Sequence, residues 1–110
     1  MEILRSSENL SKADMFKMVK DPKVRKIKEV GGEVLTVTDW VLYTDKNNKG
    51  DLVNLLAIKC EEGCFATNSA TFIQQFTEIV DFFEGSFSRI EVLEETSKNG
   101  RTFYQCSYVD

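Results

Sequence analysis

The sequence predicts a mainly β fold with helices, in which one helix lies between the third and fourth of five strands. Three observations lead to this expectation. Five strand-like runs fall between residues 34 and 109, an amphipathic run fits a helix over residues 70–84, and two turns rich in Asn, Gly and cations occupy residues 45–50 and 96–101. The order strand-strand-strand-helix-strand-strand is typical of an OB-fold-like five-stranded barrel, whose first and last hairpin loops bind oligonucleotides.

Residues 1–30 are expected to form a helical arm that packs on this barrel, and residues 31–110 the OB-fold-like domain itself. Ser11 is a suitable N-cap for a helix through residues 13–19. Pro22 is expected to end that helix, because its ring removes a backbone donor and clashes with the preceding turn. The chain is expected to resume as a second short helix before two glycines break the pattern. An arm this short cannot enclose a core of its own.

The first three strands follow from a change to period-two alternation after the arm. Residues 34–43 form a long run rich in β-branched and aromatic side chains, and residues 52–59 form the second strand after the first Asn/Gly turn. These two strands are therefore expected to pair as a hairpin. An acidic turn with a glycine then leads into a short third strand over residues 64–67.

The helix and the last two strands complete the predicted order. Ser69 is a good N-cap for residues 70–84, where apolar side chains recur at spacings of three and four and form a wide stripe that would close one end of the barrel. The fourth and fifth strands are expected over residues 87–95 and 101–109. Asn99-Gly100 between them is a strong hairpin signal, in which both central positions of the turn are expected to have positive φ.

Charge is unevenly distributed along a chain whose formal net charge is −4. Residues 1–30 carry eight cations and five anions, which leaves them at +3 and the remaining residues at −7. A local basic patch can bind phosphates even when the whole protein is acidic. Because the hydrophobic content is 42%, no apolar run is long enough to span a bilayer and the N-terminus lacks a signal-peptide pattern, we expect an ordered cytoplasmic protein.

Catalytic and metal chemistry have little support in this composition. The chain has no His, no nucleophile elbow and no phosphate-binding glycine loop, so we expect no enzymatic activity and no cofactor. The three cysteines, Cys60, Cys64 and Cys106, are expected to be free thiols in a reducing cytosol. Cys60 and Cys64 have the spacing of half a zinc site, but a structural site needs four ligands, so no metal is expected.

Nucleic-acid binding has more support, because cations along a groove and aromatic faces for base stacking together bind single strands of any sequence. Trp40 and Tyr43 have opposite strand parity, so a regular strand presents at most one of them to a given side. Each aromatic candidate can equally belong to the core, and each loop lysine can equally be solvated. The candidate nucleic-acid-binding residues are Trp40, Tyr43, Lys46, Lys49, Lys59, Phe65, Lys98, Arg101 and Phe103.

The last strand offers a choice between its two faces. Phe103, Gln105 and Ser107 share one face, and Tyr104, Cys106 and Tyr108 share the other, because side chains alternate along a strand. The polar Gln105 and Ser107 indicate that their face is the wetter one. We therefore expect Phe103 to be exposed for stacking and Tyr104 to lie in the core.

Two segments carry a family resemblance. The last hairpin, Glu94 to Phe103, contains a Thr-Ser-Lys turn followed by Gly and Phe, and residues 57–83 combine a strand, an acidic-Gly turn, a short aromatic strand and an amphipathic helix. In these segments, and over most of residues 32–108, the chain resembles the small single-stranded-DNA-binding proteins encoded by tailed phages of Gram-positive bacteria. The turn cations and nearby aromatic residues are the family-like functional positions that can be placed in this chain.

The resemblance implies sequence-tolerant binding of single-stranded DNA in phage DNA replication or recombination, in the cytoplasm of an infected bacterial cell. RNA is not excluded as a ligand, no membrane partner is expected, and a homodimer, a cooperative array on DNA and contacts with replication proteins all stay open. The alternative hypothesis is a protein-interaction module, such as a phage-encoded inhibitor whose acidic domain mimics DNA and occupies a host enzyme.

Overall fold

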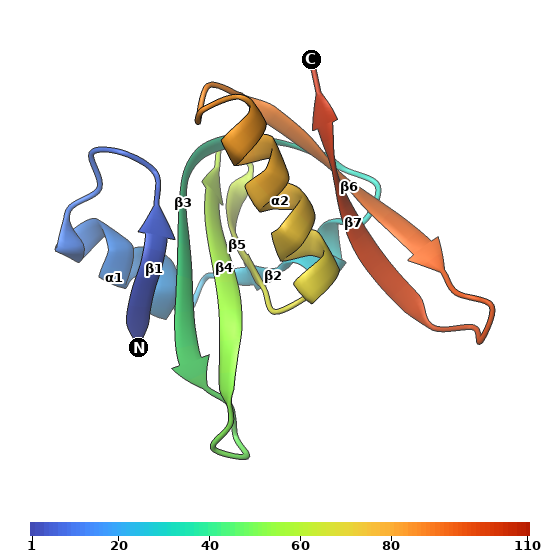
Figure 1. The fold of residues 1–110 in the computed structure, drawn as a ribbon, viewed down its shortest axis with the longest axis horizontal. Coiled ribbons are helices and arrows are strands. Elements are labelled where there is room, and N and C mark those ends of the chain that lie inside the picture. The colour runs from blue at the N-terminus through green and yellow to red at the C-terminus, as the bar shows by residue number, and fades with distance from the viewer.

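The computed structural model describes residues 1–110 as a curled, mainly β sheet with two α-helices (Figure 1). From Val34 onward the observed order is strand-strand-strand-helix-strand-strand, which confirms the predicted order. The elements are β1 (Glu2–Ser6), α1 (Lys12–Lys20), β2 (Arg25–Lys26), the 3₁₀-helix η1 (Ile27–Val30), β3 (Val34–Lys46), β4 (Leu52–Cys60), β5 (Gly63–Thr67), α2 (Ala70–Phe82), β6 (Arg89–Thr96) and β7 (Thr102–Val109).

The sheet is an open half-barrel. Its strands follow the order β2-β5-β4-β3-β6-β7, and β1 pairs with β3. The long strand β3 makes this curvature possible, because its first residues pair with β6 whereas its remaining length pairs with β4. A closed barrel would require β7 to return to β5. Instead, Arg25 and Lys26 of β2 pair in parallel with Phe65 and Ala66, so the edge of β5 is already occupied.

The helix α2 fills the concave side of the half-barrel and forms the main core with the sheet (Figure 1). As predicted, Ser69 is its N-cap, and the Ser69 hydroxyl accepts a hydrogen bond from the backbone N–H of Phe72 at 3.2 Å. Phe72 and Phe76 are fully buried, and the ring of Trp40 packs edge-on against Phe76 with centroids 5.8 Å apart. The apolar stripe of the sequence is therefore the face that packs on the sheet.

A second, smaller cluster lies on the convex side, where α1 covers the sheet. Met18 of α1 is buried against Val41 and Tyr43 of β3 and Ala57 of β4. Residues of this long hairpin are thus covered on both faces, one set by α2 and the other by α1. Neither α-helix is long and apolar enough to cross a lipid bilayer.

The N-terminal segment is only partly helical, which differs from the expected arm. The Ser11 cap is confirmed: its hydroxyl accepts from the Asp14 backbone N–H at 3.1 Å, and the Asp14 carboxylate accepts from the Ser11 backbone N–H at 3.2 Å. However, β1 and β2 are strands, and the expected second helix is β2 followed by a single 3₁₀ turn. Their pairing partners, β3 and β5, are distant in sequence, so no local pattern signals either strand.

Candidate nucleic-acid interface

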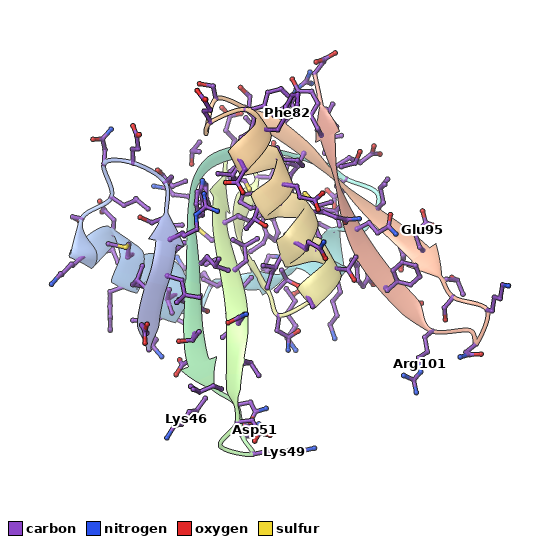
Figure 2. The ribbon with its side chains drawn as sticks, viewed as in Figure 1. Lys46, Lys49, Asp51, Phe82, Glu95 and Arg101 are labelled. Carbon is purple, nitrogen blue, oxygen red and sulfur yellow. The ribbon has the colours of Figure 1, made fainter.

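The two cationic loops have the same local structure. In the β3–β4 loop, Gly50 has a φ of 83°, and the Asn47 side chain accepts hydrogen bonds from the backbone N–H groups of Lys49 and Asp51 at 2.9 and 3.0 Å. The backbone N–H of Gly50 donates to the Asn47 carbonyl at 3.0 Å. This arrangement is a type I turn followed by a left-handed glycine, a common hairpin connection. It holds Lys49 at the tip of the loop and Lys46 where β3 enters the loop (Figure 2).

The β6–β7 loop repeats this design. The backbone N–H of Gly100 donates to the Ser97 carbonyl at 2.9 Å, and the Ser97 hydroxyl accepts from the Arg101 backbone N–H at 3.2 Å. Gly100 has a φ of 78°, but Asn99 is not among the residues with positive φ. The prediction of positive φ at both turn positions is therefore wrong, because the longer connection needs only one left-handed residue. Lys98 and Arg101 are exposed in this loop.

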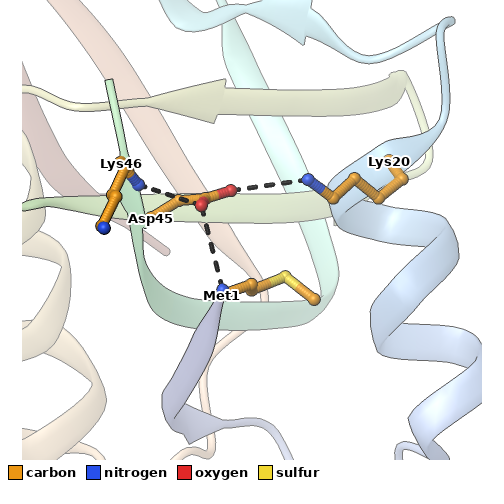
Figure 3. Close-up of polar contacts among 4 residues, drawn as sticks. All are labelled: Met1, Lys20, Asp45 and Lys46. Atoms are coloured by element: carbon orange, nitrogen blue, oxygen red, sulfur yellow. Dashed lines mark hydrogen bonds and ion pairs between the residues drawn. The ribbon is translucent and has the colours of Figure 1, made fainter. Parts of the chain in front are cut away.

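Asp45, at the loop end of β3, connects the first hairpin to the N-terminal segment (Figure 3). Its carboxylate accepts the backbone N–H of Lys46 at 2.9 Å, and it forms ion pairs with Lys20 Nζ at 3.4 Å and with the Met1 amine at 3.9 Å. The backbone hydrogen bond from Lys46, together with the charge of Lys20, lowers the pKa of Asp45 below its usual range. These contacts stabilise the residue that precedes Lys46 at the start of the loop.

A groove lies at the open seam of the half-barrel, between the bodies of the two hairpins. It spans β4, β5, η1 and β7 and has a volume of about 420 Å³. Two cations, Lys26 and Lys28, line it, and neither forms an ion pair. Its other lining residues are Ile27, Leu55, Ala66, Thr67, Asn68, Ser69 and Tyr104. The groove exists because β2 and η1 hold the edge of β5, so β7 stays apart from it.

Lys26, Lys28 and Tyr104 line the groove but are not among the binding residues predicted from the sequence. The available signal was the charge of +3 on residues 1–30, which indicated a basic patch without locating it. Only the fold brings the end of this segment beside β5 and opposite β7. Lys26 and Lys28 are distant in sequence from both hairpin loops, so the sequence does not show that they lie beside the hairpins.

None of the four loop cations lines this groove, so the expected cations do not share it. Lys46 and Lys49 lie at the end of the β3–β4 hairpin, whereas Lys98 and Arg101 lie at the end of the β6–β7 hairpin (Figures 1 and 2). The hairpins diverge, so each tip is a separate pair of cations. Glu95, which pairs with Phe103 across the second hairpin, reduces the positive potential near that tip.

Three predicted stacking residues are buried, so this part of the expectation needs correction. Trp40, Tyr43 and Phe65 are only 6%, 5% and 1% exposed. Trp40 and Phe65 belong to the concave core, and Tyr43 belongs to the convex cluster under α1. Opposite strand parity does not expose either Trp40 or Tyr43, because both sides of β3 are covered. None of the three rings presents a face on which a base could stack.

Lys59 also lies away from the groove. It is near the end of β4 opposite to the hairpin tip, in a hollow beside α1 that is also lined by Asp14 and Asp39. These carboxylates make the surroundings of Lys59 unfavourable for a phosphate. Lys59 therefore does not belong with the other predicted cations.

The two neighbouring aromatic residues of β7 have different environments. Phe103 is 36% exposed, as expected for a stacking candidate. Tyr104 was expected in the core, and it packs against the edge of the concave core. It is half-buried and lines the groove, where its hydroxyl donates to the Glu94 carboxylate at 3.3 Å. Desolvation, together with the charge of Glu94, raises the pKa of Tyr104. A Cβ at residue 31 would lie only 3.2 Å from this ring, so the glycine leaves room for it.

Comparison with known proteins adds no relative: no family model, no curated protein and no solved structure matches this chain.

Proposed function

We propose that this chain is a non-catalytic protein that binds single-stranded DNA with little sequence preference in phage DNA replication or recombination. In this proposal its half-barrel is an OB-fold whose seam is held open by β2. Four strand pairings support the relation to an OB-fold. They join β3 to β4, β4 to β5, β3 to β6 and β6 to β7. The observation that carries the proposal is the groove with Lys26 and Lys28, flanked by two cation-bearing hairpins.

In the proposed complex, an unpaired strand lies in the groove with its phosphates against Lys26 and Lys28. The loop cations neutralise further phosphates beyond the groove, and the ring of Tyr104, which lines it, supplies a surface for a base. Lysine side chains contact phosphates as point charges and do not read base edges, which accounts for the tolerance of sequence. Because the groove offers two lysines and few exposed rings, we expect the binding free energy to come mainly from charge.

The test is fluorescence anisotropy of a labelled oligo-dT titrated with the protein at several salt concentrations. Trp40 is buried, so its emission is a poor reporter of direct contact, and the label belongs on the DNA. We expect Lys26→Ala with Lys28→Ala to weaken binding roughly tenfold and to reduce the slope of log affinity against log salt concentration by about 1.4. Matched RNA and double-stranded DNA competitors distinguish the class of nucleic acid.

Lys12→Ala with Lys17→Ala is the matched control, because it removes the same charge from exposed positions of α1. We expect this control to bind within about twofold of the wild type, because a distant solvated charge acts only through the screened field. The proposal fails if the wild type binds no oligonucleotide at low salt, or if the groove and control variants lose affinity equally.

The alternative, an acidic module that mimics DNA, is motivated by the charge of −7 on residues 31–110. The unpaired lysines of the groove weigh against it on this face, because a DNA mimic presents carboxylates to a basic partner. A stoichiometric host protein that is retained after nuclease treatment, together with absent oligonucleotide binding, would favour the alternative.

A further inference from the structure

A group of aromatic side chains is exposed where α2 ends beside the end of β7. Phe82 is 79% exposed and Tyr108 is 40% exposed. Phe83 stacks on Tyr108 with centroids 4.3 Å apart, and Phe82 meets Phe83 edge-on at 5.0 Å. We call Phe82, Phe83 and Tyr108 the aromatic patch. Single exposed apolar residues are ordinary, but a contiguous set of large rings indicates an interaction surface.

A hollow of about 450 Å³ adjoins the aromatic patch between α2 and β7. The patch rings line it together with Ile79 and Gln75. The Gln75 side-chain oxygen accepts the backbone N–H of Cys106 at 2.8 Å, so the edge of β7 is capped at this point. A partner therefore cannot pair with that N–H as an added strand. The hollow is shallow, so an apolar side chain of a partner would pack against the exposed rings beside it.

Carboxylates surround the aromatic patch. Asp81 is paired with Arg5 at 2.9 Å, whereas Glu78, Glu84 and Asp110 form no ion pair. The last turn of α2 contains no cation, although the helix macrodipole favours cations at that end. Stability of the free chain therefore does not explain the acidic residues here.

Two further groups bear on the charge of this region. Arg89 is near enough to Tyr108 to lower its pKa, but the stronger effect is the opposite one: Tyr108 donates to the Asp110 carboxylate at 3.0 Å, which raises its pKa. Because Arg5 neutralises Asp81, three carboxylates remain against one arginine, and the region is acidic. Phe82 also lies at the end of the molecule opposite to Lys46 and Lys49 (Figure 2). An acidic surface repels phosphates, so these rings are poorly placed as a platform for bases.

We propose that the aromatic patch is a docking site for a partner protein, which packs an apolar side chain flanked by Lys or Arg against the rings. The rings and the hollow would bury the apolar side chain, and the unpaired carboxylates Glu78, Glu84 and Asp110 would select the neighbouring cations by charge complementarity. This site is separate from the proposed nucleic-acid groove, and its existence does not depend on DNA binding. A protein with both surfaces would connect a bound strand to a basic partner.

The probe is a short, fluorescein-labelled amphipathic peptide of Leu and Lys, measured by anisotropy against the full chain. Phe82→Ala is the main variant, because Phe82 is the most exposed ring and its loss leaves the core intact. We expect it to weaken peptide binding about tenfold or more, as for an aromatic anchor. Glu78→Gln with Asp110→Asn should weaken binding severalfold at low salt and less at high salt.

Leu52→Ala is the matched control, since Leu52 is 72% exposed but lies beside the β3–β4 loop. We expect it to bind the peptide like the wild type, and Phe82→Ala to retain the wild-type affinity for oligo-dT. Circular dichroism checks that each variant is folded. A second peptide with Ser in place of Leu should bind more weakly if the rings are used.

Several results would overturn the proposal. They are no peptide binding by the wild type, equal affinities of Phe82→Ala and Leu52→Ala, or equal affinities of the Leu and Ser peptides. A dimer of the free chain that Phe82→Ala dissociates in analytical ultracentrifugation would assign the patch to a second copy instead. Loss of oligo-dT binding in Phe82→Ala would assign it to nucleic acid. Failure of oligo-dT binding in the wild type would leave the peptide result unaffected.

Discussion

The two faces of the β3–β4 hairpin are covered in different ways. On the concave face, α2 and the sheet form a core of 16 buried residues, whereas on the convex face α1 buries a cluster of only four. The convex layer also depends on exposed polar contacts, such as those of Asp45 with Lys20 and the Met1 amine. The difference indicates that the concave core determines the fold, and that the N-terminal layer is a weaker addition.

Thiol reactivity should differ most strongly between these regions. Burial raises the pKa of both Cys60 and Cys106 to about 12, so at pH 8 only about one in ten thousand of these thiols is ionised. Cys64 is half-buried and lines the hollow beside α1. We expect Ellman's reagent to modify one thiol per folded chain rapidly and the other two only after unfolding. Equal rates for all three would show that the concave core opens readily.

Truncation of one buried side chain on each face compares the two layers energetically. Phe76→Ala should lower the free energy of unfolding by about 3–5 kcal/mol, because it leaves a large cavity in a close-packed core. Met18→Ala should cost about 2 kcal/mol, because α1 can move to fill the space under it. Urea denaturation followed by Trp40 fluorescence measures both. Equal losses would contradict the proposed hierarchy.

Acid should act mainly on the N-terminal layer, because two of the three carboxyl groups with lowered pKa values, Asp14 and Asp45, hold α1 and its contacts. The third, Glu29, caps η1 beside the concave core. Hydrogen bonds with the N-cap serine lower the pKa of Asp14. The backbone N–H of Lys26 lowers the pKa of Glu29, and that of Lys46 lowers the pKa of Asp45. A carboxyl group with a lowered folded-state pKa stabilises the fold above its unfolded pKa, near 4, and this contribution disappears as pH falls through the folded value.

We therefore expect hydrogen-exchange protection factors in α1 to fall between about pH 5 and pH 3 while those in α2 change less. Asp14 and Glu29 are exposed and Asp45 is only half-buried, so this is the smallest of the expected effects. The variant Asp45→Asn should reduce the pH-dependent loss of protection in α1, because it removes the carboxylate that pairs with Lys20. An equal loss of protection in both helices would indicate global acid unfolding rather than release of one layer.

Much of the concave half could be predicted because its signals are local. The α2 stripe, the Ser69 cap and the five strands depend on periodicity and caps within single elements, and they agree with the structure. The two-residue strand β2 could not be predicted, because its existence depends on an edge of β5 that lies 40 residues further along the chain. The same pairing decides that the half-barrel stays open.

The candidate site was predictable only in its loops. Turn chemistry identified Lys49 and Lys98 as exposed hairpin cations, but burial of Trp40 and Tyr43 depends on two helices that cover opposite faces of one strand. Alternation along a strand predicts which residues share a face, and it cannot tell whether that face meets solvent. The lysines of the groove were hidden for a similar reason, since topology alone brings them opposite β7.

The pairing of β2 with β5 has a consequence for how a long polymer would reach the proposed groove. A closed small barrel is filled by side chains and would leave no opening between these two strands. Here the groove opens along the flank of the molecule, between β5 and β7, because β2 occupies the edge of β5. A polynucleotide could therefore enter sideways at any internal position and leave in the same manner, whether or not it has an end.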